Sequence, residues 1–312
     1  MKKITILFII LGTAFSSFAQ DDLLNMMEKE TPSKASAVFA TFKSPRVINL
    51  QSNETMKAKQ LDFRINHRFG PTVIDQSTVY GLYNMFGLDA AQMRLSFDYG
   101  ITDNIMVGAG RTNLQIYDLS LKAKLFSQKT KGKGAFPLSI VYYGNMGINT
   151  LTFADQSRDN FFTSRLAFVN QIILTRKFNE YISFELVPSM IHHNLVPTGV
   201  NDIYALGIGA SIKITRSTRF NFEYIPRFNA RDQAIDATGK IAYDEFAFGF
   251  DIETGGHVFQ VHLTNAQGLI EQQFITENTN MIALNTLRLG FNLSRTFSLD
   301  SSSKNKKPEN KK

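Results

Sequence analysis

The 312-residue sequence contains no cysteine and no tryptophan. Without cysteine the chain can form no disulfides, thiolate metal sites, cysteine nucleophiles or cysteine-linked lipid anchors. Glycine and proline together number 28, which excludes collagen-like and low-complexity character. Beyond the N-terminus no apolar run approaches the roughly 18 residues of a transmembrane helix. The chain is nevertheless 43% apolar and has 27 Phe and 10 Tyr, which is enough for a folded structure rather than global disorder.

The net charge of +7 is concentrated at the two ends of the chain. Residues 1–19 carry +2 and residues 301–312 carry +4, so the segment 20–300 is left with +1. A nucleic-acid-binding domain concentrates basic charge on a folded face. The charge distribution therefore argues against a nucleic-acid partner.

The first 19 residues have the pattern of a signal peptide. Lys2 and Lys3 form a positive start, and residues 4–15 form an apolar stretch that is too short to span a bilayer of about 30 Å. Ser17 and Ala19 place small residues at the −3 and −1 positions, which predicts cleavage between Ala19 and Gln20. We expect an exported mature protein.

Residues 20–56 differ from the rest of the chain. A short amphipathic helix is predicted over residues 21–28, ending before Pro32, and one or two short extended pieces are predicted over residues 37–52. This segment is interpreted as an ordered periplasmic lead-in that lies on the main domain. A plug or a partner-docking arm is the alternative.

From Lys57 onward apolar and polar residues alternate with a period of two, which indicates β-strands. In 61–69, for example, Leu61, Phe63 and Ile65 alternate with Asp62 and Arg64. About twelve strands are predicted, and those over 104–112, 137–145 and 161–176 are less regular than the others. The predicted strands cover residues 61–69, 92–101, 104–112, 118–125, 137–145, 161–176, 182–190, 206–214, 220–224, 246–252, 259–263 and 287–293.

Most of these runs have about 9–11 residues or more, enough for a tilted strand to cross a membrane. Short connections at 102–104, 177–180, 216–218 and 253–256 alternate with long ones at 70–91, 146–160, 194–202, 228–244 and 265–284. The connection at 127–136 is longer than a tight turn, and 111–117 is a short outer loop. The alternation is typical of an outer-membrane barrel with short periplasmic turns, an even strand number and closed edges. The predicted fold is therefore an all-β, antiparallel up-and-down transmembrane β-barrel over 57–300; a secreted soluble β-sandwich or barrel is the alternative.

Four runs of the sequence resemble a known family: 41–49 (TFKSPRVIN), 61–70 (LDFRINHRFG), 86–89 (FGLD) and 95–103 (LSFDYGITD). The family that they resemble is the uncharacterised β-barrel family of Gram-negative bacteria catalogued as domain of unknown function 5777. The resemblance covers roughly 40–300 and is most specific in 41–111. It implies an outer-membrane-type barrel and supplies no catalytic residues.

The motifs of enzymes and cofactor sites are mostly absent. The chain has no HExxH zinc motif and no GxSxG elbow, and Gly207 and Gly209 lack the third glycine of a dinucleotide fingerprint. His192 and His193 are adjacent in an extended run and so point to opposite faces, which suits a shared metal poorly. Residues 155–160 only faintly resemble a calcium loop. We predict no catalytic residues, no metal and no cofactor; a lipid-modifying enzyme using His192 on the lipid face is a third hypothesis.

Charged residues share the polar face of the predicted strands and are candidates for lining or binding in the lumen. They comprise eight cations and five anions: Asp62, Arg64, Arg68, Arg94, Asp98, Lys122, Lys124, Arg165, Glu185, Lys213, Glu223, Asp251 and Arg288. Arg and Lys in a pore favour anions. The alternative is a narrow or occluded lumen that ion pairs hold closed, as a barrel of only about twelve strands suggests.

The sequence thus predicts an integral outer-membrane protein of a Gram-negative bacterium. Its function is predicted to be a narrow pore or passive binding or transport protein for small polar or anionic solutes. The alternative is a structural or interaction barrel with a sealed, ion-paired lumen. Outer-membrane lipid and the barrel-assembly machinery are the other expected partners. Residues 301–312 are predicted to be a Lys-rich disordered tail.

Overall fold

The computed structural model describes residues 35–71, 87, 91–130, 132–153, 155–231, 233–235 and 239–299. The predicted signal peptide, the predicted helix at 21–28 and the Lys-rich tail lie outside these residues.

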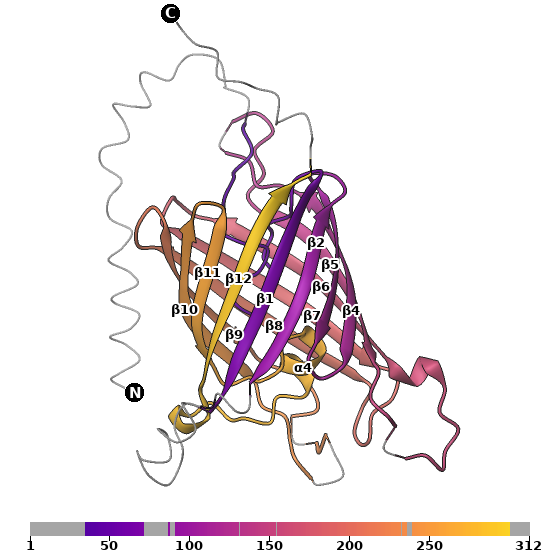
Figure 1. Ribbon diagram of the computed structural model, residues 1–312. Coiled ribbons are helices and arrows are strands. Elements are labelled where there is room, and N and C mark those ends of the chain that lie inside the picture. Colours follow the sequence, from indigo (N-terminus) through magenta and orange to yellow (C-terminus); the bar gives the residue numbers. More distant parts are fainter. Residues whose placement is uncertain are drawn as a thin grey trace, which may run out of the picture.

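Twelve antiparallel strands form a closed barrel in which each strand pairs with its neighbours in sequence and β1 pairs with β12 (Figure 1). This confirms the predicted fold class and strand number. The strands are β1 (Gln60–Pro71), β2 (Gln92–Gly100), β3 (Ile105–Thr112), β4 (Ile116–Phe126), β5 (Ser139–Asn149), β6 (Leu166–Lys177), β7 (Ile182–His193), β8 (Asp202–Lys213), β9 (Thr218–Ile225), β10 (Glu245–Thr254), β11 (His257–Thr264) and β12 (Arg288–Ser298).

The period-two pattern of the sequence becomes the two faces of the wall. On β2, Met93, Leu95 and Phe97 are exposed on the outside, whereas Arg94 and Ser96 are buried inside. Aromatic side chains of neighbouring strands pair on the outer surface, as Phe63 does with Phe97 at 5.1 Å between ring centroids. Such cross-strand pairs stabilise the strand register. The outside is thus an apolar surface and the inside is a largely polar one.

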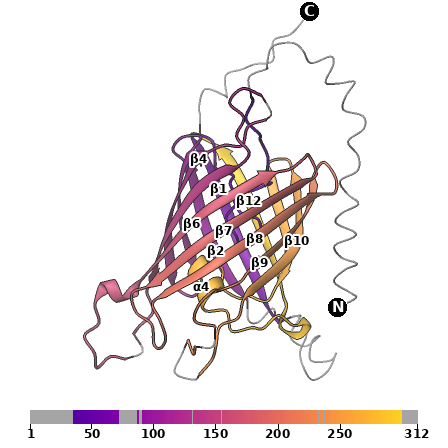
Figure 2. The ribbon, with the colours of Figure 1, turned by 180° about the vertical axis from the view of Figure 1, so that it is seen from behind.

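The two ends of the barrel differ (Figure 2). At the end called here the turn end, β1 begins, β12 ends and short connections such as 101–104, 178–181, 214–217 and 255–256 join strands. The opposite loop end carries the long connections 150–165, 226–244 and 265–287. The predicted alternation of short and long connections is confirmed, and the long connection 127–138 lies at the turn end.

Several predicted strand boundaries are off by four or five residues, and one loop is displaced at both of its ends. The loop expected at 146–160 is 150–165, because β5 continues to Asn149 and β6 starts only at Leu166. Gly147 weakened the strand pattern in this region. It faces the lumen, and a Cβ on it would overlap the side-chain amide of Gln272, so the glycine is what allows a loop-end helix to approach the wall.

The helical pieces are short: η3 (Phe162–Arg165), α4 (Glu271–Thr276) and η4 (Leu284–Thr286). All six residues of α4 are buried. Among the described residues, no helix is long and apolar enough to cross a membrane.

Candidate functional site

Residues 41–53, here called the lumenal segment, lie inside the barrel (Figure 1). The segment enters from the turn end, and all of its residues except Lys43 are buried. A lead-in lying on the main domain was the preferred interpretation of this region, but residues 41–53 lie inside the barrel. The lumenal segment contains no regular helix or strand, so its backbone N–H and C=O groups need other partners.

One wall carboxylate accepts three consecutive backbone N–H groups of the lumenal segment. Glu223 on β9 accepts hydrogen bonds from Ile48 at 3.2 Å, Asn49 at 2.8 Å and Leu50 at 3.1 Å. Successive N–H groups that converge in this way form a cradle for an anion. The chain reverses tightly at this point, with Val47 N–H bonded to the Leu50 carbonyl at 2.9 Å. Glu223 therefore holds the turn at the centre of the lumen.

Cationic and amide side chains of the wall bind the carbonyl groups of the same segment. The Nζ of Lys122 on β4 donates to the carbonyls of Pro45 at 2.8 Å and Ser52 at 3.1 Å. Arg219 donates to the carbonyl of Thr41 at 3.3 Å, and Asn292 to that of Ile48 at 3.3 Å. Wall side chains thus replace the hydrogen bonds that a regular secondary structure would have made.

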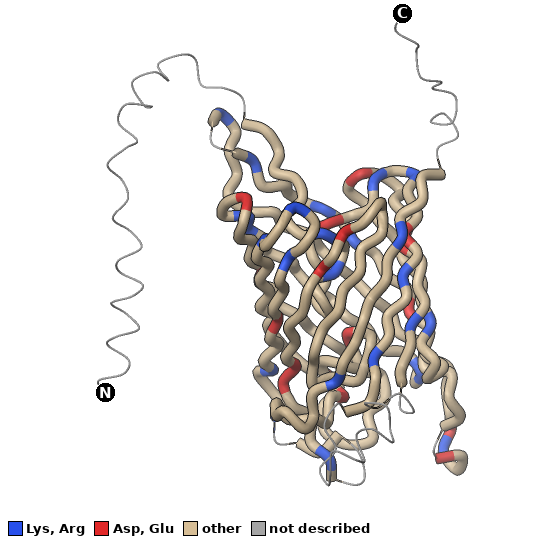
Figure 3. Tube along the Cα trace, turned by 60° about the vertical axis from the view of Figure 1, so that its left-hand side comes forward, with Lys and Arg blue, Asp and Glu red and all other residues tan. Residues whose placement is uncertain are grey.

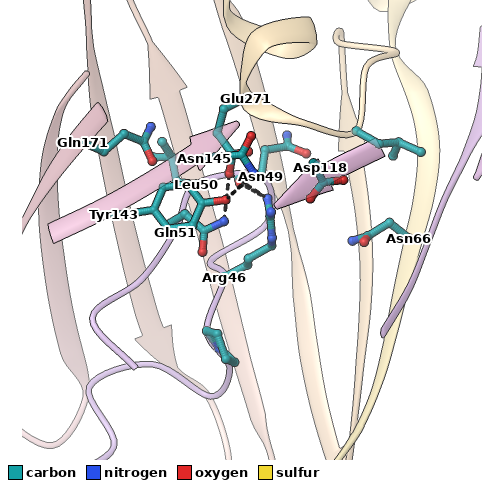
Figure 4. Close-up of polar contacts among 12 residues, drawn as sticks. Arg46, Asn49, Leu50, Gln51, Asn66, Asp118, Tyr143, Asn145, Gln171 and Glu271 are labelled. Atoms are coloured by element: carbon teal, nitrogen blue, oxygen red, sulfur yellow. Dashed lines mark hydrogen bonds and ion pairs between the residues drawn. The ribbon is translucent and has the colours of Figure 1, made fainter. Parts of the chain in front are cut away.

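The lumenal segment also contacts the loop end through α4 (Figure 4). Arg46 forms an ion pair with Glu271 at 3.1 Å, and Gln51 donates to the same carboxylate at 2.8 Å. Both partners of the ion pair are almost fully buried. The segment from the turn end and the helix from the loop end therefore meet inside the barrel.

Apolar contacts hold the other side of the lumenal segment. Phe42, Val47 and Leu50 belong to one buried cluster with Phe274 and Ile275 of α4. The wall contributes to this cluster mostly from β5–β8, and Ile225 at the end of β9 adds one more residue. The members from β5–β8 are Val141, Tyr143, Val169, Ile173, Val187, Ile191, Ile203 and Ala205. The interior of this barrel therefore contains a hydrophobic core, and the strands β5–β8 are called its apolar side.

The remaining strands, β9–β12 and β1–β4, form the polar side of the lumen. Every buried charged residue of a strand lies on them, except Glu185 on β7. Charged residues of both signs occur along the full height of the barrel (Figure 3). The polar side supplies hydrogen bonds to the lumenal segment, and the apolar side packs against its side chains.

The structure places most of the predicted lumen candidates on the inner face. The buried ones are Asp62, Arg64, Arg68, Arg94, Lys122, Glu185, Glu223, Asp251 and Arg288. Asp98, Lys124 and Lys213 are half-buried, and Lys213 pairs with Glu180 at the turn end. Arg165 is not on a strand: it ends η3 and donates to the carbonyl of Asn149 at 3.0 Å.

Many of these charged side chains form ion pairs or donate hydrogen bonds to backbone carbonyls. Arg64 pairs with Asp62 at 3.3 Å, and Arg94 forms two bonds to Asp118 at 2.9 and 2.6 Å. Arg68 donates to the carbonyls of residues 266 and 268. Neither carboxylate oxygen of Glu185 has a hydrogen-bond partner among the described residues.

Sequence reasoning missed several buried charges: Arg46, Asp118, Arg219, Glu245 and Glu271. Asp118 shares the strand parity of Lys122, so it could have been found. Strand parity could not have identified Arg46 and Glu271, because these residues lie outside strands. It could not have identified Glu245 either, because this residue is the first of its strand. With these five residues included and Arg165 left out, nine cations face eight anions, so the excess of cations falls from three to one.

A cavity of about 570 Å³ remains at the loop end. It is lined by Arg165, Lys240, Gln272 and Glu277 together with apolar residues such as Leu151 and Phe153. A smaller neighbouring cavity of about 100 Å³ shares His193 and Glu277 with it. Glu277 is accessible from these cavities, and partial desolvation by the protein atoms around it raises the pKa of its carboxyl group to about 7.

The residues that the sequence offered for catalysis or metal binding make other contacts in the structure. His192 bonds Asp202 at 2.7 Å on the rim, whereas the nearby Ser189 is buried in the lumen against Gln171. Asp155 accepts two bonds from Ser157, which lower the pKa of its carboxyl group. Among the described residues, no group of three His, Asp or Glu side chains is arranged to hold a metal ion.

A family model described as a membrane bound beta barrel domain, domain of unknown function 5777, matches residues 42–297. The chain belongs to this family, which confirms the resemblance seen in the sequence. The match begins at residue 42, so all of the lumenal segment except Thr41 is part of the family domain. No curated protein matches the sequence.

Three solved barrels are similar to this chain at low identity and low TM-score. The "KdgM porin" is 8% identical with a TM-score of 0.43, over 77% of this chain and 99% of that chain. The "Salmonella typhi OmpF complex with Daunomycin" is 8% identical with a TM-score of 0.39, over 76% and 97% of the two chains. The outer membrane channel DcaP of Acinetobacter baumannii is 11% identical with a TM-score of 0.33, over 78% and 100%. These scores are too low to carry an argument about function.

Proposed function

We propose that the protein is an outer-membrane conduit that is closed at rest by its own lumenal segment and binds small polar or anionic solutes at its loop end. The observation that carries this proposal is the lumenal segment itself, held by Glu223, Lys122 and the ion pair of Arg46 with Glu271. Passage of a solute then requires the segment to move.

The size of the barrel supports a conduit behind the lumenal segment. Barrels of about 8 strands are filled by their own side chains, whereas about 16–18 strands leave an aqueous channel. Twelve strands lie between these limits, and here a peptide of 13 residues, together with α4, occupies the space. Removal of the peptide would leave a lumen bounded on one side by charged and amide groups.

The orientation follows from the same geometry. In bacterial outer-membrane barrels the short turns and both chain ends face the periplasm. By this rule the turn end is periplasmic and the loop-end cavity faces outward. Insertion by the barrel-assembly machinery into outer-membrane lipid, after cleavage of the predicted signal peptide, belongs to the same proposal.

The solute class rests on the loop-end cavity. Arg165 and Lys240 contribute cationic groups to its lining and Glu277 contributes a single carboxyl group. The cavity has the size of a small-molecule site, which is commonly about 300–1,000 Å³. Small polar or anionic solutes match this mixture of groups.

Conductance in planar bilayers tests the proposal. The full-length protein should show no steady open level. A variant in which residues 41–53 are replaced by a Gly-Ser segment of equal length should show discrete steps. A cold-versus-boiled gel shift checks that both proteins have formed the barrel. A steady open level in the full-length protein contradicts closure at rest.

A sealed structural or interaction barrel is the second candidate. It is favoured by the hydrophobic cluster in the lumen, which a passage for polar solutes does not need. If the variant without the lumenal segment folds and still fails to conduct, this second candidate replaces the first.

A further inference from the structure

The outer surface of β6 carries one polar side chain within an apolar column. Its outward-facing residues are Leu166, Phe168, Asn170, Ile172 and Leu174, followed by Arg176 at the turn end, so Asn170 lies among apolar neighbours on both sides along the strand. The side chain of Asn170 is exposed on the outside of the barrel. A polar group at this depth is costly in hydrocarbon, because lipid tails offer no hydrogen bonds.

Asn170 has one partner within its own chain. The hydroxyl group of Tyr142 on β5 donates to its Oδ1 at 2.7 Å. No bond from the Asn170 amide nitrogen to a described residue occurs, so the two donors of this group face outward without a partner. His67 also faces lipid away from the strand ends, but its ring is stacked on Phe291 at 4.8 Å.

A groove lies beside this polar pair. Its volume is about 350 Å³, and its lining includes Leu119, Leu121, Gly144 and Met146 as well as Tyr142 and Asn170. Gly144 is directly opposite Asn170 in the β5–β6 register. A Cβ at this position would lie 3.0 Å from the Tyr142 hydroxyl oxygen, so the glycine makes room for the tyrosine to reach across.

Apolar side chains project from the surface on the side of Asn170 away from the groove. Ile172 and Met190 are each more than a third exposed, and Met190 lies opposite Asn170 in the β6–β7 register. The patch therefore has a groove on one side of Asn170 and projecting apolar side chains on the other. A twofold axis through Asn170 would bring the projecting side chains of one copy to the groove of the other.

We propose that this patch, centred on Asn170, is an interface between two copies of the chain within the membrane. An amide group is both a donor and an acceptor, so two Asn170 side chains at a twofold axis satisfy each other. Lipid supplies no such partner at mid-wall depth, since its ester and headgroup atoms lie near the surface. Both copies would have the same orientation, with the axis along the membrane normal. This inference is independent of the proposed function.

Cysteine cross-linking tests the contact, because the natural chain has no cysteine. F168C places a thiol on β6 beside Asn170 and keeps the amide. L293C places one on the lipid face of β12, six strands away around the barrel. Mild oxidation of membranes should give a covalent dimer for F168C and almost none for L293C. Equal cross-linking of both variants would overturn the interface.

Single-molecule photobleaching of labelled protein in bilayers at varied protein-to-lipid ratio measures the association itself. Wild-type protein should be dimeric, and Asn170→Leu should weaken the association about tenfold, the size of one hydrogen bond lost in a membrane. The matched control Ile172→Leu, on the same strand, should leave the association unchanged. A cold-versus-boiled gel shift checks folding of each variant. A monomeric wild-type protein would refute the proposal, whether or not lipid is retained in the groove. An Asn170→Leu variant that dimerises like wild type would refute it as well.

Discussion

The polar and apolar sides of the lumen bind the same segment in different ways. On the polar side, Glu223 and Lys122 make hydrogen bonds to its backbone, which every sequence of residues shares. On the apolar side, β5–β8 pack against Val47 and Leu50, which only a particular sequence supplies. The polar side therefore stabilises the presence of a peptide, and the apolar side selects which peptide and which register. A lumen for polar solutes alone would not need the second of these.

The largest effect is expected from the polar side. Glu223→Ala leaves three buried N–H groups of residues 48–50 without an acceptor and should destabilise the seated lumenal segment by about 4 kcal/mol. Hydrogen exchange of these amides should then accelerate by about 10²–10³-fold. Exchange in the strands should change little. Unchanged protection of residues 48–50 would show that Glu223 does not hold the segment.

Removal of an apolar contact should have a somewhat smaller effect. Leu50→Ala creates a cavity in the lumenal cluster and should cost about 3 kcal/mol. The same exchange measurement applies, and Phe39→Ala, which removes a side chain that is 78% exposed, is the control. If Leu50→Ala protects the amides as well as wild type does, the apolar side contributes no specificity.

A change in the wall can displace the segment without altering it. A Cβ at Gly207 on β8 would lie 2.5 Å from Leu50 Cδ2, so Gly207→Ala should overpack this contact by about 1–3 kcal/mol. Gly209→Ala is the matched control, because the three atoms nearest to its Cβ would all belong to Glu185 of the wall. Exchange at residues 48–50 should rise in the first variant and not in the second. Equal behaviour of the two would mean that the wall, rather than Leu50, absorbs the strain.

An ion pair between strands should stabilise the barrel and not the lumenal segment. Asp118→Asn weakens the bidentate pair with Arg94 and should lower the free energy of unfolding by about 2 kcal/mol. Thermal unfolding followed by gel shift measures the loss, and hydrogen exchange at residues 48–50 should stay within about threefold of wild type. Release of the segment in this variant would show that the two functions of the polar side are coupled.

The smallest effect concerns solutes at the loop end. Because the pKa of Glu277 is raised to about 7, its carboxyl group is mostly neutral at pH 6 and mostly charged at pH 8. Sulfate, whose charge is constant in this range, should therefore bind about fivefold more weakly at pH 8. Calorimetry measures this change, and Glu277→Gln should abolish it. Tighter binding at pH 8 would contradict the assignment of this cavity to anions.

The irregular strands of the sequence turned out to be informative. The runs predicted at 137–145 and 161–176 alternate poorly because β5 and β6 are apolar on both faces: Val141, Val169 and Ile173 face the lumenal core, and Ile140, Phe168 and Ile172 face outward. A strand buried on both faces is expected to lose its alternation. This was the one signal in the sequence that could have revealed an occupied lumen.

The sequence by itself determined the barrel and the inward parity of residues such as Arg64, Arg94 and Glu223, because a period of two is a local property of each strand. Only the tertiary structure decided what these residues do. Glu223 and Ile48 are 175 positions apart in the sequence. Arg46 and Glu271 are even further apart. These contacts form only when the barrel closes and the strands pair in the right register. A local sequence pattern therefore cannot predict them. The same charges that suggested a lining for solutes bind a segment of their own chain.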